Sequence, residues 1–153
     1  MILDETRQSQ YEDSNWGERT MRVIVASSND SLRRSVDRSL EQLSCEIRTV
    51  SRSGDLLISV LRWDYDLVVL DMALEGMTAL ETLSILKRLR PKSPVIVLSA
   101  DRSADLRTQA LQAGALRYFV IPFDLDSLVS AARSIERETV VPGSLDRACG
   151  APA

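Results

Sequence analysis

The sequence predicts an α/β protein in which five parallel strands alternate with five helices. Short apolar runs recur between about residues 21 and 137, and segments with helical spacing of apolar residues separate them. We read these runs as near-continuous, which is typical of strands buried on both faces of a parallel sheet. Right-handed crossovers between such strands place helices on both faces. We therefore predict a doubly wound (βα)5 arrangement.

The expected strands are the five apolar runs of the chain. They cover residues 22–26, 46–50, 67–70, 95–98 and 116–120. Each run is followed by a segment long enough for a helix, which is the order that a parallel sheet requires because its strands need crossover connections.

The expected helices carry apolar stripes at three- or four-residue spacing. These stripes are Leu32, Val36, Leu40 and Leu43; Leu56, Val60 and Leu61; Leu80, Leu83, Leu86 and Leu89; and Leu125, Leu128, Ala132 and Ile135. Asn29, Asp30 and Ser31 are candidate N-caps of the first helix. The fourth helix should run from about Ser103 to Gly114, since glycine readily adopts the left-handed conformation that ends a helix.

The 153 residues fit one domain between two polar ends. We expect residues 1–20 to form a flexible arm, residues 21–138 to form the folded domain, and residues 139–153 to form a tail. The first segment is polar and lacks apolar periodicity, and the last one carries proline, glycine and alanine.

Composition and charge exclude several classes of protein. No apolar run approaches the roughly 20 residues of a membrane span, and no signal peptide is visible, so we expect a cytoplasmic protein without a membrane partner. The net charge of −3 is also the charge of the first 20 residues, so the remainder is balanced and nucleic acid is not an expected partner. The chain has no histidine, which removes histidine-ligated metal sites and histidine-based catalytic triads. Its two cysteines are expected to be reduced.

The ends of the predicted strands hold the candidate functional residues. In open parallel sheets, function gathers at the carboxyl ends of the strands. Asp71 closes the apolar run LVVLD, and a carboxylate there is costly unless it is paired or lies at an exposed rim. Asp71 is therefore either a functional acid or an ordinary rim aspartate.

Four segments, in this order and spacing, resemble the receiver domain of bacterial two-component response regulators. They are MRVIVASSNDSLRRSV, YDLVVLDMALEGM, PVIVLSA and AGALRYFVIPFDLDSL. The resemblance implies a flavodoxin-like sheet with strand order 2-1-3-4-5. It also implies that Asp71 is at the phosphoacceptor position, while Ser99 and Tyr118 are at the hydroxyl and aromatic positions of the conformational switch. Pro122 matches the proline that follows the family's lysine.

Departures from the family pattern affect the expected chemistry. Ser27 and Ser28 stand where the family has an acidic pair, and Ile121 stands where it has a lysine. Mg²⁺ prefers carboxylates and waters, and isoleucine cannot donate a hydrogen bond to a phosphoryl group. We therefore expect no bound metal and no cofactor. Asp30 and Glu75 are the acids that could compensate, although the alignment does not place them at the ligand positions.

The resemblance implies an atypical receiver that works mainly by protein–protein interaction in phosphorelay-type signalling. Phosphorylation would be weak or absent, and the module would not be an enzyme. Its partner face would comprise the fourth helix, fifth strand and fifth helix, with the mixed-sign residues Arg107, Gln112, Arg117, Asp126 and Arg133. A histidine kinase or another regulator would bind there, and the same face could form a homodimer.

Two alternatives remain open from the sequence. The first is a phosphorylatable receiver that uses Asp71 as acceptor with non-standard ligands and that would need Mg²⁺. The second is a flavodoxin-like enzyme or nucleotide binder. This second alternative is disfavoured, because the loop SSNDS after the first strand has no glycine to let a phosphate approach the backbone.

Overall fold

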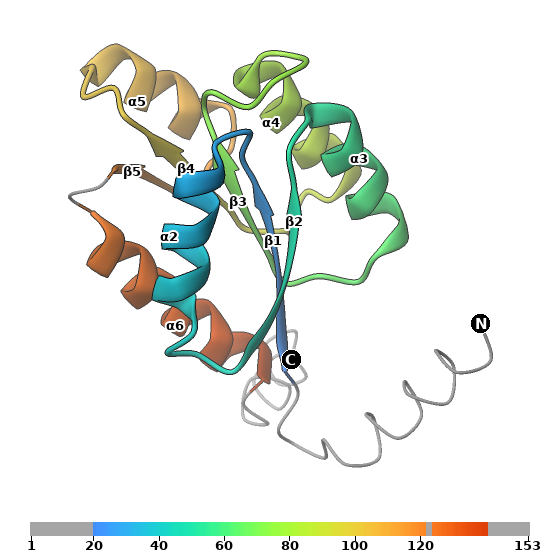
Figure 1. Ribbon diagram of the computed structural model, residues 1–153. Helices are drawn as coiled ribbons and strands as arrows, with labels where there is room; N and C mark the ends of the chain where they lie inside the picture. The colour runs from blue at the N-terminus through green and yellow to red at the C-terminus, as the bar shows by residue number, and fades with distance from the viewer. Residues whose placement is uncertain (1–19, 122–123, 141–153) are drawn as a thin grey trace, which may run out of the picture.

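The computed structural model describes residues 20–121 and 124–140, and within them five strands alternate with five helices (Figure 1). In chain order the elements are β1 Met21–Ala26, α2 Asp30–Leu40, β2 Cys45–Val50, α3 Ser53–Arg62, β3 Leu67–Asp71, α4 Ala79–Leu89, β4 Val95–Ser99, α5 Ala104–Gln112, β5 Arg117–Val120 and α6 Leu125–Val140. The arm and tail expected at the two ends lie almost wholly outside the described residues.

The strands form one parallel sheet in the order β2-β1-β3-β4-β5. Helices α2 and α6 lie on one face, and α3, α4 and α5 lie on the other (Figure 1). This arrangement confirms the doubly wound flavodoxin-like fold expected from the sequence.

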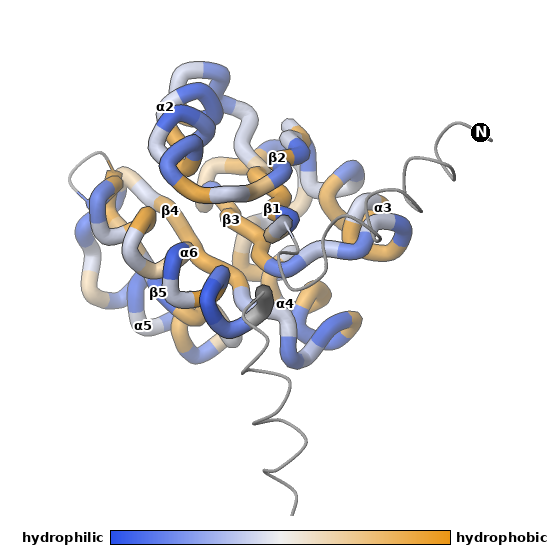
Figure 2. The backbone as a smooth tube through the Cα atoms, turned by 90° about the horizontal axis from the view of Figure 1, so that it is seen from below, coloured by the Kyte–Doolittle hydropathy of each residue, from blue (hydrophilic) through white to orange (hydrophobic). Residues whose placement is uncertain are grey.

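Two apolar cores lie on the two faces of the sheet. One joins Val36 and Leu40 of α2 to Leu128 and Ala132 of α6, and the other is built mainly on α3 and α4. In Figure 2 the apolar strands run between helices that alternate between polar and apolar residues. The sheet is thus covered on both sides, as its central strands require.

The prediction that the strands are buried on both faces is confirmed for the central strands and is wrong for the two edge strands. β3 and β4 are buried along their whole length, and β1 has one half-buried residue. In β2, by contrast, Glu46, Arg48 and Thr49 are exposed, and β5 begins at the exposed Arg117. An edge strand has a neighbour on one side only and is not completely covered by helices, so it tolerates charged side chains.

The helix ends agree with the local signals in the sequence. The Asn29 side chain accepts a hydrogen bond from the Leu32 amide at 3.0 Å, and Ser103 caps α5 in the same way. Gly114 follows α5 with φ of 115°, and a Cβ there would lie 2.7 Å from Cγ of Lys87. Glycine is required at this position by both its backbone conformation and its contact with α4.

Three leucines of the predicted helical stripes are not on the buried face of a helix. Leu43 is buried but follows the end of α2, while Leu61 and Leu89 are 62% and 40% exposed. Leu61 is five residues from Leu56, which turns it about 140° away on an α-helix. A strict three-residue spacing likewise drifts by about 60° at each step, so Leu89 leaves the buried face.

Two observations on the described residues bear on environment. None of their helices is both long enough and apolar enough to cross a membrane. Cys45 is a free, half-buried thiol, and desolvation, with Glu136 and Asp37 nearby, raises its pKa to about 11. The raised pKa favours the protonated, less nucleophilic form of this thiol at neutral pH. Cys149 lies outside the described residues.

Two leucines of α3, the buried Leu56 and the exposed Leu61, give a matched test of the core. Leu56→Ala should lower the free energy of unfolding by about 2–5 kcal/mol, because Leu56 is fully buried and its loss leaves a cavity. Leu61→Ala makes the same chemical change in the same helix at an exposed site, and should change stability by less than about 0.5 kcal/mol. Urea denaturation measures both values. Similar losses in the two variants would contradict the assigned orientation of α3.

Candidate functional site

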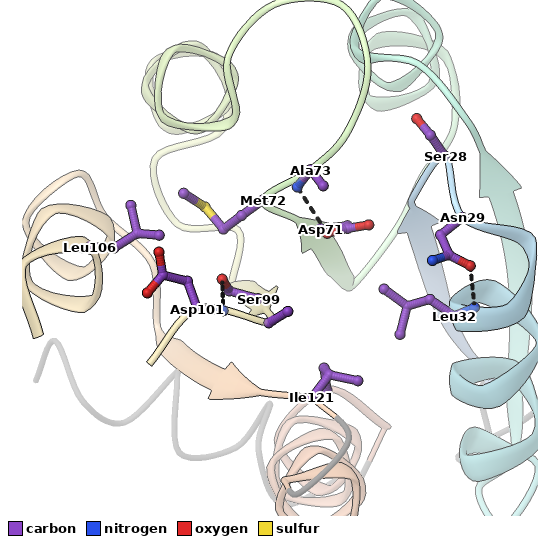
Figure 3. A pocket seen from close by; sticks show the side chains of 11 residues that line it. Ser28, Asn29, Leu32, Asp71, Met72, Ala73, Ser99, Asp101, Leu106 and Ile121 are labelled. Atoms are coloured by element: carbon purple, nitrogen blue, oxygen red, sulfur yellow. Dashed lines mark hydrogen bonds between the residues drawn. The ribbon is translucent and has the colours of Figure 1, made fainter. Parts of the chain in front are cut away.

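A cavity of about 700 Å³ lies at the carboxyl ends of the central strands (Figure 3). It is lined by Ser28, Asn29, Leu32, Asp71, Met72, Ala73, Ser99, Ala100, Asp101, Leu106 and Ile121. Four of the residues singled out from the sequence, Ser28, Asp71, Ser99 and Ile121, are therefore brought together as predicted. The parallel sheet causes this, since all of its strands end at the same edge.

Asp71 is held in the floor of this cavity by two hydrogen bonds. It is only 6% exposed. Its Oδ1 accepts from the Ala73 amide at 2.9 Å, and its Oδ2 accepts from the Ser27 hydroxyl at 2.7 Å. Asp71 is thus a partnered acid rather than an ordinary rim aspartate. Ser27, which directly follows β1, is itself buried and acts as a hydrogen-bond partner of the carboxylate.

Ser28 has a different role, because its hydroxyl joins neighbouring loops. It donates to the Ser51 carbonyl at 2.6 Å and accepts from the Glu75 amide at 2.9 Å. The hydroxyl therefore connects the loops that follow β1, β2 and β3. Its hydrogen bonds go to these loops rather than to the Asp71 carboxylate, although both residues line the cavity.

The loop after Asp71 is also fastened to the loop after β2. The Ser53 amide donates to the Glu75 carbonyl at 2.9 Å, and the Ser53 hydroxyl accepts from the Met77 amide at the same distance. Arg52 forms an ion pair with Glu75 at 3.3 Å. These contacts fix the path of the chain between β3 and α4.

Ser99 and Tyr118 meet at the backbone of Asp101. The Ser99 hydroxyl accepts from the Asp101 amide at 2.9 Å, and the Tyr118 hydroxyl donates to the Asp101 carbonyl at 2.7 Å. Tyr118 is 3% exposed and belongs to the core on the α3–α5 face, with the Arg107 guanidinium 5.5 Å from its ring centroid. Both side chains therefore hold the loop between β4 and α5.

Asp101 was not among the residues singled out from the sequence. Its carboxylate caps the local turn by accepting from the Ser103 amide at 2.7 Å. Its backbone amide donates to the Ser99 hydroxyl, and its carbonyl accepts from the Tyr118 hydroxyl. A polar residue two positions after a strand end is a weak signal for its place in the cavity. The Tyr118 contact is long-range, and nothing local in the sequence predicts it.

Ile121 is half-buried at the end of β5 and forms an apolar wall of the cavity. Its amide donates to the Ser99 carbonyl at 2.9 Å, which continues the sheet by one residue. Pro122 lies outside the described residues.

The donor set around Asp71 does not fit a Mg²⁺ site built from carboxylates. Among the described residues, no three acidic, cysteine or histidine side chains lie together as a metal-binding group. The nearest side-chain partner of Asp71 is a hydroxyl that donates its hydrogen to the carboxylate. Asp30 pairs with Arg33 and Glu75 with Arg52, so both acids that could compensate have other partners.

The surface suggested by the sequence for protein contact lies on α5, β5 and α6. Arg107, Gln112, Arg117 and Asp126 are exposed, and Arg133 is half-buried. Between β5 and α6, a shallow groove of about 370 Å³ is lined by Arg117, Phe119, Asp126, Ser127, Ser130, Ala131 and Ser134. The face therefore combines both signs of charge with a small groove.

Sequence comparison matches residues 23–133 to the family model of the response regulator receiver domain. The transcriptional regulatory protein TcrA of Mycobacterium tuberculosis is 30% identical over 122 residues, which is 80% of this chain and 48% of TcrA. The transcriptional regulatory protein HprR of Escherichia coli is 32% identical over 118 residues, covering 77% of this chain and 52% of HprR. The chain thus spans about half the length of these two relatives.

Solved structures share the fold. The receiver domain of the Francisella response regulator 1452 superposes with a TM-score of 0.72 at 22% identity, over 78% of this chain and 99% of that one. A CheY-like receiver domain protein from Methanospirillum hungatei has a TM-score of 0.71 at 22% identity, over 78% and 95% of the two chains.

The bond between Ser27 and Asp71 can be tested through stability. Ser27→Ala should lower the free energy of unfolding by about 1.5–3 kcal/mol, because a buried carboxylate loses a hydrogen-bond donor. Ser31→Ala is the matched control, since Ser31 is exposed on α2 and the change should cost less than about 0.5 kcal/mol. Chemical denaturation compares the two variants. Equal stability of Ser27→Ala and the parent would show that the bond contributes nothing.

Proposed function

Because the chain belongs to the response regulator receiver domain family, we propose that it is an atypical receiver that signals mainly through protein contacts. In this proposal, Mg²⁺-dependent phosphorylation of Asp71 is weak or absent. The observation that carries the proposal is the pairing of Asp71 with the Ser27 hydroxyl at 2.7 Å, in a cavity whose opposite wall is the apolar Ile121.

The chemistry of phosphoryl transfer supports this proposal. Transfer to a carboxylate depends on positioning and on neutralisation of charge at the phosphoryl oxygens, with little covalent work for the protein. The described residues that line the cavity include no lysine, arginine or histidine, and no group of three described metal-ligating side chains includes Asp71. Loss of one preorganised electrostatic contact typically costs about 3–4 kcal/mol in the transition state.

The contacts of Tyr118 and of the loop after Asp71 support a single resting conformation. The Tyr118 ring is buried, and its hydroxyl is bonded to the Asp101 carbonyl although Asp71 carries no phosphoryl group. The loop between β3 and α4 is bonded through Ser28 and Ser53. A phosphoryl group could shift this conformation only by binding an alternative one more tightly.

The partner surface in this proposal is the α5–β5–α6 face. Its exposed Arg107, Arg117 and Asp126 offer charges of both signs, which suits a protein partner with a complementary pattern. We propose a histidine kinase or another regulator as that partner, and a second copy of this chain as an alternative occupant of the same face. The module would act in the cytoplasm and would have no enzymatic activity of its own.

A phosphorylatable receiver is the second candidate. It is favoured by the position of Asp71, which lines the cavity beside Ser99 and the Ala73 amide. These groups could stabilise a phosphoryl group on Asp71 in part. The two candidates differ in the rate of labelling by a phosphodonor and in its dependence on Mg²⁺.

Restoring the missing charges should increase phosphorylation. With acetyl phosphate and Mg²⁺, we expect the variant Ser27→Asp/Ser28→Asp/Ile121→Lys to be labelled at Asp71 at least about 100-fold faster than the wild type, since each restored electrostatic contact typically contributes a factor of about 10²–10³. Intact-protein mass spectrometry measures the rate.

Two controls accompany this experiment. Asp71→Asn in the restored background should abolish labelling, and Ile121→Lys alone should give an intermediate rate or none. Far-ultraviolet circular dichroism establishes that each variant is folded. Rapid Mg²⁺-dependent labelling of the wild type, at a rate near that of the restored variant, would overturn the proposal in favour of the second candidate.

Partner binding should depend on the α5–β5–α6 face more than on Asp71. For a partner recovered by cross-linking in the native host, Asp71→Ala should leave the dissociation constant within about threefold of wild type. Arg117→Glu should weaken binding by about tenfold or more, because reversing an interfacial charge typically costs more than 1.4 kcal/mol. Calorimetry with the purified partner measures both. A folded Asp71→Ala protein that no longer binds would contradict this expectation.

A further inference from the structure

The cavity at the strand ends has the dimensions of a small-molecule site. Its volume of about 700 Å³ lies within the roughly 300–1,000 Å³ that is usual for ligand pockets. Sites of this kind are mostly apolar and carry a few polar groups that orient the ligand. The walls of this cavity have that composition.

Much of the wall is apolar side chain that the protein core leaves partly uncovered. Leu32 of α2, Met72 after β3, Leu106 of α5 and Ile121 after β5 each pack against one of the two cores and remain half-exposed. Figure 3 shows them approaching the cavity from separate elements. Such a surface gains free energy when an organic group covers it.

The formal charge of the lining is negative. Asp71 and Asp101 contribute carboxylates, and no basic side chain is among the lining residues. A carboxylate has about four acceptor sites. Each Asp71 oxygen accepts one hydrogen bond, from the Ala73 amide or the Ser27 hydroxyl, so each can accept another. An anionic ligand would be repelled here, whereas a cation would be attracted.

The two carboxylates are arranged for separate contacts rather than for one metal ion. In Figure 3 the Asp71 side chain is directed toward Ser28 and Asn29, while Asp101 lies on the side of Leu106 and Met72. No described group of three potential metal ligands includes them. The apolar wall between the two carboxylates suits an organic cation better than a compact hydrated ion, because Mg²⁺ keeps several waters and needs octahedral ligands.

We propose that this cavity binds a small organic cation, a primary ammonium on a hydrocarbon body. The ammonium donates to the Asp71 carboxylate, and the hydrocarbon covers Leu32 and Ile121. The inference does not depend on the proposed function, because it requires neither weak phosphorylation nor a protein partner.

A series of three probes with the same hydrocarbon body tests the charge preference. Hexylammonium, hexanol and hexanoate are titrated into the ¹⁵N-labelled full chain, and amide shifts are followed by NMR. We expect saturable shifts at Ala73, Ala100, Asp101 and Ile121 with hexylammonium. Its affinity should exceed that of hexanoate by about tenfold or more, because a charge-assisted bond is replaced by repulsion.

Variants locate the site. Ile121→Lys places an internal ammonium in the cavity and should weaken hexylammonium binding by about fivefold or more, and Asp71→Asn should act in the same direction. Asp37→Asn is the matched control, since it removes one exposed carboxylate of α2 outside the cavity and should leave affinity unchanged. The dispersed amide spectrum of each variant reports whether it is folded, and the probe series on the wild type decides the matter if a variant is not.

Four results would overturn the proposal. Hexanoate could bind as tightly as hexylammonium. The amine shifts could be non-saturable or scattered over exposed acids. Asp37→Asn could weaken binding as much as Asp71→Asn does. Mg²⁺ at low millimolar concentration could displace the amine while shifting the same amides. These readouts concern ligand binding alone, so they are distinguishable from failure of the phosphorylation and partner experiments.

Discussion

Burial of the central strands on both faces is the constraint from which the rest of the structure follows. β3 and β4 are buried along their whole length, and β1 nearly so, which leaves no room for unpaired polar groups within the sheet. Their buried polar side chains, Ser27, Asp71 and Ser99, all stand at or just beyond the carboxyl ends. Because the strands are parallel, these ends meet at one edge and create the cavity.

Within that edge, the buried Asp71 determines which neighbours are compatible. A carboxylate that is 6% exposed needs hydrogen bonds to offset its desolvation, and it receives them from the Ser27 hydroxyl and the Ala73 amide. Neutral partners satisfy the acceptor atoms without neutralising the charge. The described residues that line the cavity therefore include acids and no base, and this imbalance underlies both the proposed loss of phosphoryl chemistry and the proposed affinity for a cation.

The loops around the cavity are connected to one another by hydrogen bonds. Ser28 and Ser53 join the loops after β1, β2 and β3, while Asp101 joins the loop after β4 to Tyr118 on β5. A change at Asp101 thus has a short path of bonded groups, through Tyr118, to the α5–β5–α6 face. The same bonds oppose large movement of these loops, because each movement would break several of them together.

The sequence by itself determined the elements, their order and the candidate edge. Apolar runs, the Asn29 cap, the helix start near Ser103 and Gly114 act through neighbours within a few residues, so local patterns were sufficient to predict them. The resemblance of four segments to receiver domains added the strand order and the approach of Ser27 to Asp71, which are 44 residues apart in the chain.

Only the tertiary structure decided what those side chains do. Tyr118 reaches Asp101 across 17 residues and Ser28 reaches Glu75 across 47, and such partners depend on how strands and loops are placed side by side. The exposure of Leu61 and of the charged residues in β2 was likewise settled by which surfaces the neighbouring elements cover. Local sequence specifies the conformation of a segment, but burial and long-range hydrogen bonds are properties of the assembled fold.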